Sequence, residues 1–182
     1  MKYQICISAA SKGKSAQEGK DLAHEMGKVL AENRHTLLTG ATTGLPYEAA
    51  RGAKLAGGQS VGLSPAASRL AHIRKYRLPV DMYDFILFTG LNYAGRDNLL
   101  INCSDAVIII GGRLGTTHEF TVAMETGKPV AILHGAGGTS ELFDDLMRSA
   151  GRDPKSVIEE DDPYVLLRKL TKELNQQHRY LL

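Results

Sequence analysis

The sequence predicts an α/β fold, with a doubly wound, mainly parallel sheet that carries helices on both faces. Three observations lead to this prediction. Short apolar runs alternate with segments of helical periodicity along the whole chain. These runs are apolar at successive positions, which is typical of strands buried on both faces. Glycines cluster where the runs end, at the points where such a sheet needs tight turns into helices.

The first half of the chain contains two strand-to-helix steps and a third strand. Ser15 is a plausible N-cap for the first helix, in which Leu22, Met26, Val29 and Leu30 recur at helical spacing. Pro46 suits the first turn of the second helix. The expected strands cover residues 3–8, 36–39 and 60–63, and the expected helices cover residues 16–33 and 46–56.

The second half repeats the pattern after a stretch, residues 64–84, that fits either a solvated connection or a lid. A strand at 85–89 is followed by a glycine-bearing loop at 90–98. Later strands are expected at 106–110, 129–133 and 157–158, and helices at 98–103, 116–126, 140–149 and 163–177. The order as a whole favours a Rossmann-like arrangement, in which ligands bind beyond the carboxyl ends of the strands where the winding reverses.

Composition excludes several classes of function. A chain of 182 residues is expected to form one domain, residues 1–182, and its net charge of +2 argues against nucleic acid or an anionic membrane as the main partner. Without Trp there is no evident stacking platform for single strands. Cys6 and Cys103 lie in apolar segments and are expected to be buried thiols in a reducing compartment, with no metal-ligand spacing. No signal peptide or membrane span is recognisable, so a cytoplasmic location is expected.

A glycine-rich turn follows the apolar run at 106–110 and precedes a predicted helix. Thr116 and Glu119 have the spacing of a capping box, so the helix is expected to begin at Thr116. Gly111, Gly112, Gly115 and Thr116 would then direct backbone N–H groups at one small volume, where a phosphate is the natural occupant. The alternative is a tight connection without a ligand.

Residues from other strand ends are expected to face the same crevice. Candidate nucleotide-binding positions are Ser8, Ala9, Gly40, Ala41 and Thr42.

Arg96, in the loop at 90–98, is a candidate phosphate ligand through paired hydrogen bonds, or else pairs with Asp97. Tyr93 and Asn92 either contact a base or are ordinary loop residues, and His118 and His134 are interpreted as surface histidines. Residues 13–15 lack the upstream glycine of a P-loop.

The glycine turn resembles the hallmark P-G-G-x-G-T-x-x-E of the LONELY GUY family, within the SLOG superfamily. The segment from Ile110 to Glu119 matches it everywhere except at the leading proline. Arg96 also precedes Asp105 by nine residues, as the essential arginine of that family does. The similarity extends over roughly residues 5–133, and it departs from the family at residues 93–97, where His, Glu and Lys of the family motif are absent.

This resemblance implies a nucleoside 5′-monophosphate as ligand, a homodimer or larger homo-oligomer, and no cofactor or metal. In the enzymatic members, the N-glycosidic bond is hydrolysed to free base and ribose 5-phosphate. Arg96 and Glu119 are then the catalytic residues, with the carboxylate stabilising a developing oxocarbenium ion. Two alternatives stay open: a non-catalytic nucleotide sensor or cofactor carrier of the superfamily, and a dinucleotide-dependent oxidoreductase, which would lack the usual glycine fingerprint after the first strand.

Overall fold

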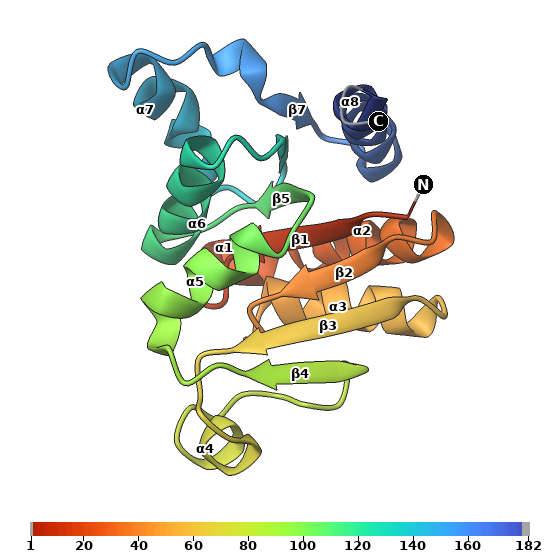
Figure 1. The fold of residues 1–182 in the computed structure, drawn as a ribbon, viewed down its shortest axis with the longest axis vertical. Helices are drawn as coiled ribbons and strands as arrows, with labels where there is room; N and C mark the ends of the chain where they lie inside the picture. The colour runs from red at the N-terminus through yellow and green to blue at the C-terminus, as the bar shows by residue number, and fades with distance from the viewer. Residues whose placement is uncertain (1, 180–182) are drawn as a thin grey trace.

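The computed structural model describes residues 2–179 and contains one seven-stranded sheet (Figure 1). Every strand pair in it is parallel, and the order is β4-β3-β2-β1-β5-β6-β7. Since β1 to β4 run outward in one direction and β5 to β7 in the other, the winding reverses between β1 and β5. The strands are β1 (Gln4–Ala9), β2 (Thr36–Thr39), β3 (Gln59–Ser64), β4 (Phe85–Phe88), β5 (Ala106–Ile110), β6 (Val130–Leu133) and β7 (Ile158–Glu160).

Helices cover both faces of the sheet, and the predicted fold class is confirmed (Figure 1). One core joins alternate strand residues such as Ile5 and Ile108 to α2, α3 and α8, and a second core joins Cys6 and Ile109 to α5, α6 and α7. The α-helices are α1 (Lys14–Glu18), α2 (Lys20–Glu32), α3 (Leu45–Leu55), α4 (Arg69–Arg74), α5 (Asn92–Asn102), α6 (Leu114–Glu125), α7 (Phe143–Ser149) and α8 (Pro163–Arg179), and short 3₁₀ turns cover Thr139–Leu142 and Pro154–Ser156.

The single helix expected at residues 16–33 is wrong, because α1 and α2 are separate helices that meet at Gly19. A Cβ on Gly19 would lie 2.6 Å from the Ala136 Cβ, so this bend depends on the close approach of the loop after β6. Ser15 is not the N-cap either. That position belongs to Gly13, and Ser15 lies inside α1.

Two further expectations are corrected in the segment before β5. Helix α5 begins at Asn92, so Arg96 lies on a helix and not in a loop. Cys103 follows the end of α5 and is exposed, whereas Cys6 in the central strand is buried as expected. The apolar residues beside Cys103 in the sequence do not bury its side chain, because Cys103 is the C-cap of α5.

Helices α2 and α3 cross at glycines. A Cβ on Gly27 would lie 2.0 Å from the carbonyl oxygen of Ala49, and one on Gly52 would lie 1.9 Å from that of His24. This close contact fixes α3, whose first turn contains Pro46 as predicted and lies against the pocket described below. Among the described residues, no helix combines the length and apolar character that crossing a membrane requires.

Candidate functional site

A pocket of about 160 Å³ opens at the carboxyl ends of β1 and β5, where the winding reverses. Its walls come from β1 and the loop after it, the loop after β2, the first turn of α3, and the first two turns of α5 and α6. Eight of the eleven site residues predicted from the sequence line it: Ser8, Ala9, Gly40, Thr42, Arg96, Gly115, Thr116 and Glu119. The other lining residues are Ile7, Ala10, Ser11, Pro46, Tyr93, Asp97 and Arg113.

The remaining three predicted residues, Ala41, Gly111 and Gly112, do not line this pocket. Ala41 is fully buried and its amide donates to Thr39 Oγ1 at 3.1 Å. Gly111 has a φ of 61° and packs so closely that a Cβ would lie 2.0 Å from Ser15 Oγ. The Gly112 amide donates to the same Ser15 hydroxyl at 3.3 Å. These residues therefore shape the turns behind the pocket.

A second, shallower hollow of about 650 Å³ lies among the loops that follow β1, β5 and β6. Gly112 lines it, and Arg113 lines both hollows. Lys12 and Lys14 add positive charge on its β1 side, opposed by Glu18 and Glu141, which are also among the lining residues.

The start of α6 forms one wall of the pocket, and the predicted capping box is wrong. Helix α6 begins at Leu114, with Arg113 in the N-cap position and no side-chain cap. Thr116 and Glu119 therefore lie within the helix, where Glu119 turns toward β1 and not back to the helix start. The N–H groups of the first turn have no partners within their own helix, so this end of α6 favours an anion.

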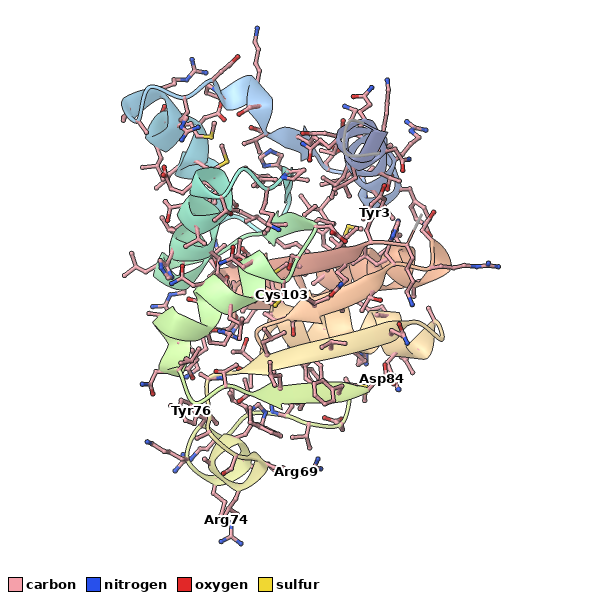
Figure 2. All side chains as sticks on the ribbon, in the orientation of Figure 1. Tyr3, Arg69, Arg74, Tyr76, Asp84 and Cys103 are labelled. Carbon is pink, nitrogen blue, oxygen red and sulfur yellow. The ribbon has the colours of Figure 1, made fainter. Side chains whose placement is uncertain are left out.

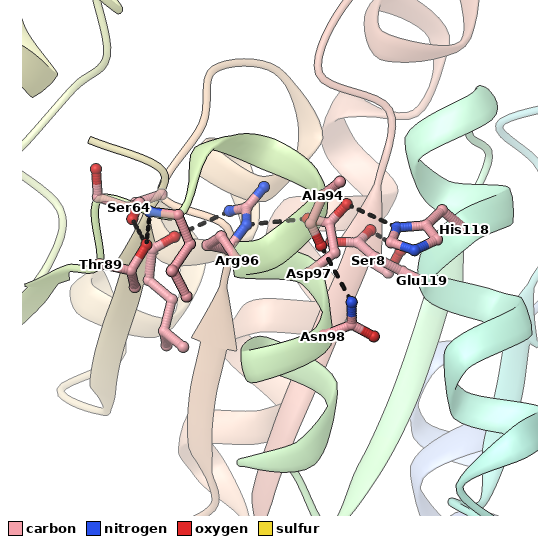
Figure 3. Close-up of polar contacts among 12 residues, drawn as sticks. Ser8, Ser64, Thr89, Ala94, Arg96, Asp97, Asn98, His118 and Glu119 are labelled. Carbon is pink, nitrogen blue, oxygen red and sulfur yellow. Dashed lines mark hydrogen bonds and ion pairs between the residues drawn. The ribbon is translucent and has the colours of Figure 1, made fainter. Parts of the chain in front are cut away.

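Five polar side chains form a charged cluster, and all of them except His118 line the pocket (Figure 3). Arg96 donates from Nε to Asp97 Oδ1 at 3.0 Å and from Nη1 to the Leu63 carbonyl oxygen at 2.9 Å. His118 Nδ1 lies 3.2 Å from Asp97 Oδ2. Ser8 donates its hydroxyl to Glu119 Oε2 at 2.5 Å. Arg96, Asp97 and Glu119 are all buried, so each charge depends on its neighbours in the cluster.

Burial, reinforced by the negative charge of Asp97, raises the pKa of Glu119 from its usual 4.5 to about 7. The positive charge of Arg96 and the hydrogen bond from Ser8 oppose this shift. Near neutral pH, Glu119 is thus present in both its protonated and its ionised form. Burial beside the same carboxylates raises the pKa of Cys6 as well, so its thiol stays protonated.

Sequence reasoning missed the roles of Asp97 and His118. The sequence indicates Asp97 only as a partner for Arg96 and His118 only as a surface residue, yet in the structure the two side chains link α5 to α6 at the cluster. One available signal was the Asp at position 97, where the family motif has Lys. Within residues 2–179, no three His, Cys, Asp or Glu side chains gather in a way that would hold a metal ion.

Comparisons with known proteins agree with this architecture. A molybdenum cofactor binding protein from Rippkaea orientalis is 27% identical with a TM-score of 0.74, over 96% of this chain and 98% of that one. A Moco carrier protein from Chlamydomonas reinhardtii is 28% identical with a TM-score of 0.76, over 97% and 99%.

A protein of unassigned function from Archaeoglobus fulgidus is 33% identical over 127 residues, which is 70% of this chain and 78% of that protein. The sequence profile of the SLOG cluster4 family matches residues 2–167. The resemblance to the SLOG superfamily is therefore confirmed, and the chain belongs to the SLOG cluster4 family.

Proposed function

We propose that this protein binds and holds a phosphorylated, nucleotide-like ligand without cleaving it. The observation that carries this proposal is the uncapped start of α6, which lines the pocket through Gly115 and Thr116 beside Arg113. A helix N-terminus and an adjacent guanidinium favour a phosphate at this point. Arg113 is exposed, and it is not among the arginines that form ion pairs with described residues, so it is available to a ligand.

The names of two similar structures, a molybdenum cofactor binding protein and a Moco carrier protein, suggest the class of ligand. A nucleotide and the molybdenum cofactor share two parts, a phosphate ester and a planar heterocycle. The pocket offers an anion site at α6, and it takes one aromatic residue, Tyr93, into its wall. We therefore propose a phosphorylated heterocycle, either a nucleotide or a pterin cofactor carried as cargo.

The hydrogen bonds of Arg96 and the protonation of Glu119 favour retention of the ligand over its hydrolysis. Two nitrogen atoms of Arg96 are already bonded inside the protein, to Asp97 and to a backbone carbonyl. Because Asp97 balances the arginine, the cluster supplies little net positive charge to a substrate. Stabilising an oxocarbenium ion also requires an ionised carboxylate, whereas the raised pKa of Glu119 leaves only part of it ionised near neutral pH.

The second candidate is hydrolysis of the N-glycosidic bond of a nucleoside 5′-monophosphate, as the sequence resemblance implies. The observation in its favour is again Glu119, since a pKa of about 7 suits a group that donates and accepts protons near neutral pH. In that case Arg96 and Glu119 are the catalytic residues and Ser8 positions the Glu119 carboxyl.

One experiment separates the two candidates. The protein is titrated with AMP and with inorganic phosphate by calorimetry, and the same AMP mixtures are analysed for free adenine by chromatography. We expect saturable binding of AMP without adenine release. Release that disappears in Glu119→Gln would instead establish the hydrolase, and absence of binding by both probes would refute the proposal.

A matched pair of variants tests the location of the phosphate. Arg113→Ala should weaken the binding of AMP and of inorganic phosphate to a similar degree, because both ligands lose their contact with the same cation. Arg148→Ala removes a positive charge of α7 that pairs with Asp144 outside both hollows, and it should leave binding unchanged. The homo-oligomer that the family resemblance implies stays a prediction, which sedimentation velocity of the purified chain checks.

A further inference from the structure

Tyr93 stands at the mouth of the pocket, in the first turn of α5. Its ring lines the cavity, yet 49% of the residue remains accessible to solvent. Its hydroxyl makes no hydrogen bond to any residue in the described part of the chain, although the nearby Tyr76 hydroxyl does. About half of this amphipathic side chain is therefore free to contact a ligand at the pocket.

Neighbouring side chains fix the position of the Tyr93 ring. Tyr76 meets it at 71°, with the ring centroids 5.7 Å apart, and the Arg96 guanidinium carbon lies 6.0 Å from its centroid. Tyr76 is held in turn by donating its hydroxyl to Asn92 Oδ1 at 2.8 Å. Figure 2 shows Tyr76 where the segment after α4 approaches the start of α5. The ring is thus oriented before any ligand arrives, which reduces the entropy lost on binding.

The backbone beside the ring is also held in an unusual conformation. Asn92 has a φ of 57°, in the left-handed region that few residues other than glycine adopt. Its amide donates to the Pro65 carbonyl oxygen at 3.1 Å, which ties the start of α5 to the segment after β3. Two connections from separate parts of the chain therefore converge on the residue that precedes Tyr93.

The size of the pocket determines where a heterocycle must lie. Its volume of about 160 Å³ is below the roughly 300 Å³ at which pockets for drug-sized ligands begin. A sugar phosphate is therefore a better match for the interior than a complete nucleotide. With the phosphate at the start of α6, the ring of the ligand projects toward the mouth. Among the residues that line the cavity, Tyr93 is the one aromatic side chain there.

We propose that Tyr93 is the stacking platform for the planar heterocycle of the ligand, with Tyr76 as the residue that positions it. This inference rests on the proposed function. It adds that the protein recognises the heterocycle of the ligand as well as its phosphate. A purine or pterin ring gains a stacking contact that a sugar phosphate lacks. The protein therefore selects phosphorylated heterocycles over ribose 5-phosphate, although both present the same phosphate to α6.

The first test compares AMP with ribose 5-phosphate by calorimetry in three variants. Tyr93→Leu keeps apolar bulk but removes the aromatic face, and it should weaken AMP roughly tenfold or more while changing ribose 5-phosphate less than twofold. Tyr93→Phe should bind AMP like the wild type. Tyr76→Leu should weaken AMP binding by a smaller factor, because the Tyr93 ring remains but is no longer held in place. Tyr76→Phe separately tests the hydrogen bond from the Tyr76 hydroxyl to Asn92.

The second test uses the absence of tryptophan from the sequence. Tyr93→Trp introduces a unique fluorophore at the proposed platform, which a stacked purine should quench and ribose 5-phosphate should not. Tyr164→Trp, at an exposed position of α8 outside the pocket, serves as the control and should respond to neither probe.

The outcomes separate this inference from the proposed function. Equal weakening of AMP and ribose 5-phosphate in Tyr93→Leu would mean that the ring only supports Arg96, and would overturn the inference while leaving phosphate binding intact. The same holds if Tyr93→Leu weakens neither probe. Failure of the wild type to bind AMP and ribose 5-phosphate would overturn the proposed function and this inference together.

Discussion

Glu119→Gln should make the stability of the protein less dependent on pH. Burial and Asp97 raise the pKa of Glu119 from 4.5 to about 7 in the folded chain, and Glu119 returns to its usual pKa on unfolding. The folded state therefore binds more protons than the unfolded state between these values, and its stability falls as the pH rises through that window. At about 1.4 kcal/mol for each pKa unit, the pKa difference between the folded and unfolded chains corresponds to roughly 3 kcal/mol of stability. This stability is present in full below the unfolded pKa of Glu119 and has been lost once the pH exceeds the folded pKa of about 7.

The assay is urea unfolding of the wild type and of Glu119→Gln at pH 5 and pH 8. Other titrating groups are shared, so they cancel when the two proteins are compared at each pH. Relative to the wild type, the variant should gain about 2–3 kcal/mol of unfolding free energy on going from pH 5 to pH 8. Gln retains an oxygen that accepts from Ser8, so the hydrogen bond at 2.5 Å has a substitute.

Glu125→Gln provides the matched control, because Glu125 lies on the same helix with a side chain that is 78% exposed. It should show the same pH dependence as the wild type. If the stability difference between Glu119→Gln and the wild type is the same at both pH values, then Glu119 is ionised throughout. In that case the desolvation argument is refuted, and so is the case for retention that depends on it.

Four other substitutions test the buried ion pair and the packing of the helices. Arg96→Met should cost about 3 kcal/mol in urea unfolding, because it leaves Asp97 buried without its main cation, and adding Asp97→Asn should recover part of that loss. Gly52→Ala should lower the unfolding free energy by about 1–3 kcal/mol or more, since its Cβ would lie 1.9 Å from the His24 carbonyl oxygen. Gly115→Ala, with no atom within 4 Å of its Cβ and no positive φ, should instead raise it by about 0.4–1 kcal/mol, and thermal unfolding measures both glycine variants.

The strands were predictable because their signal is local. The run from Ala106 to Ile110 is continuously apolar, and it forms β5 with the bounds expected from the sequence. Helix starts were less predictable where glycines and polar residues allow several interpretations. Gly90 and Gly95 suggested a loop, yet α5 begins at Asn92 and takes Gly95 into its interior, beneath Leu91.

In the candidate site too, features set by neighbouring residues were predictable, and contacts between distant residues were not. Two of the four residues expected from the glycine turn, Gly115 and Thr116, line the pocket, whereas Gly111 and Gly112 do not. The partner of Glu119 was not predictable, because Ser8 lies 111 residues earlier and reaches the carboxyl only through the pairing of β1 with β5. The capping-box spacing predicts that Glu119 bonds to the start of its own helix, whereas in the structure it accepts a hydrogen bond from Ser8 of β1.

Asp97 explains how a buried arginine and an uncapped helix end can share one pocket. A lone Arg96 at this depth would need a permanent anion, and a bound phosphate would then be required for folding as well as for function. Asp97 supplies that charge from the adjacent position, so Arg96 is satisfied before a ligand binds. In the proposed function, the phosphate is then left to the backbone of α6 and to the exposed Arg113, whose interactions form and break without exposing a buried charge. A protein that must take up a ligand and later release it benefits from this division.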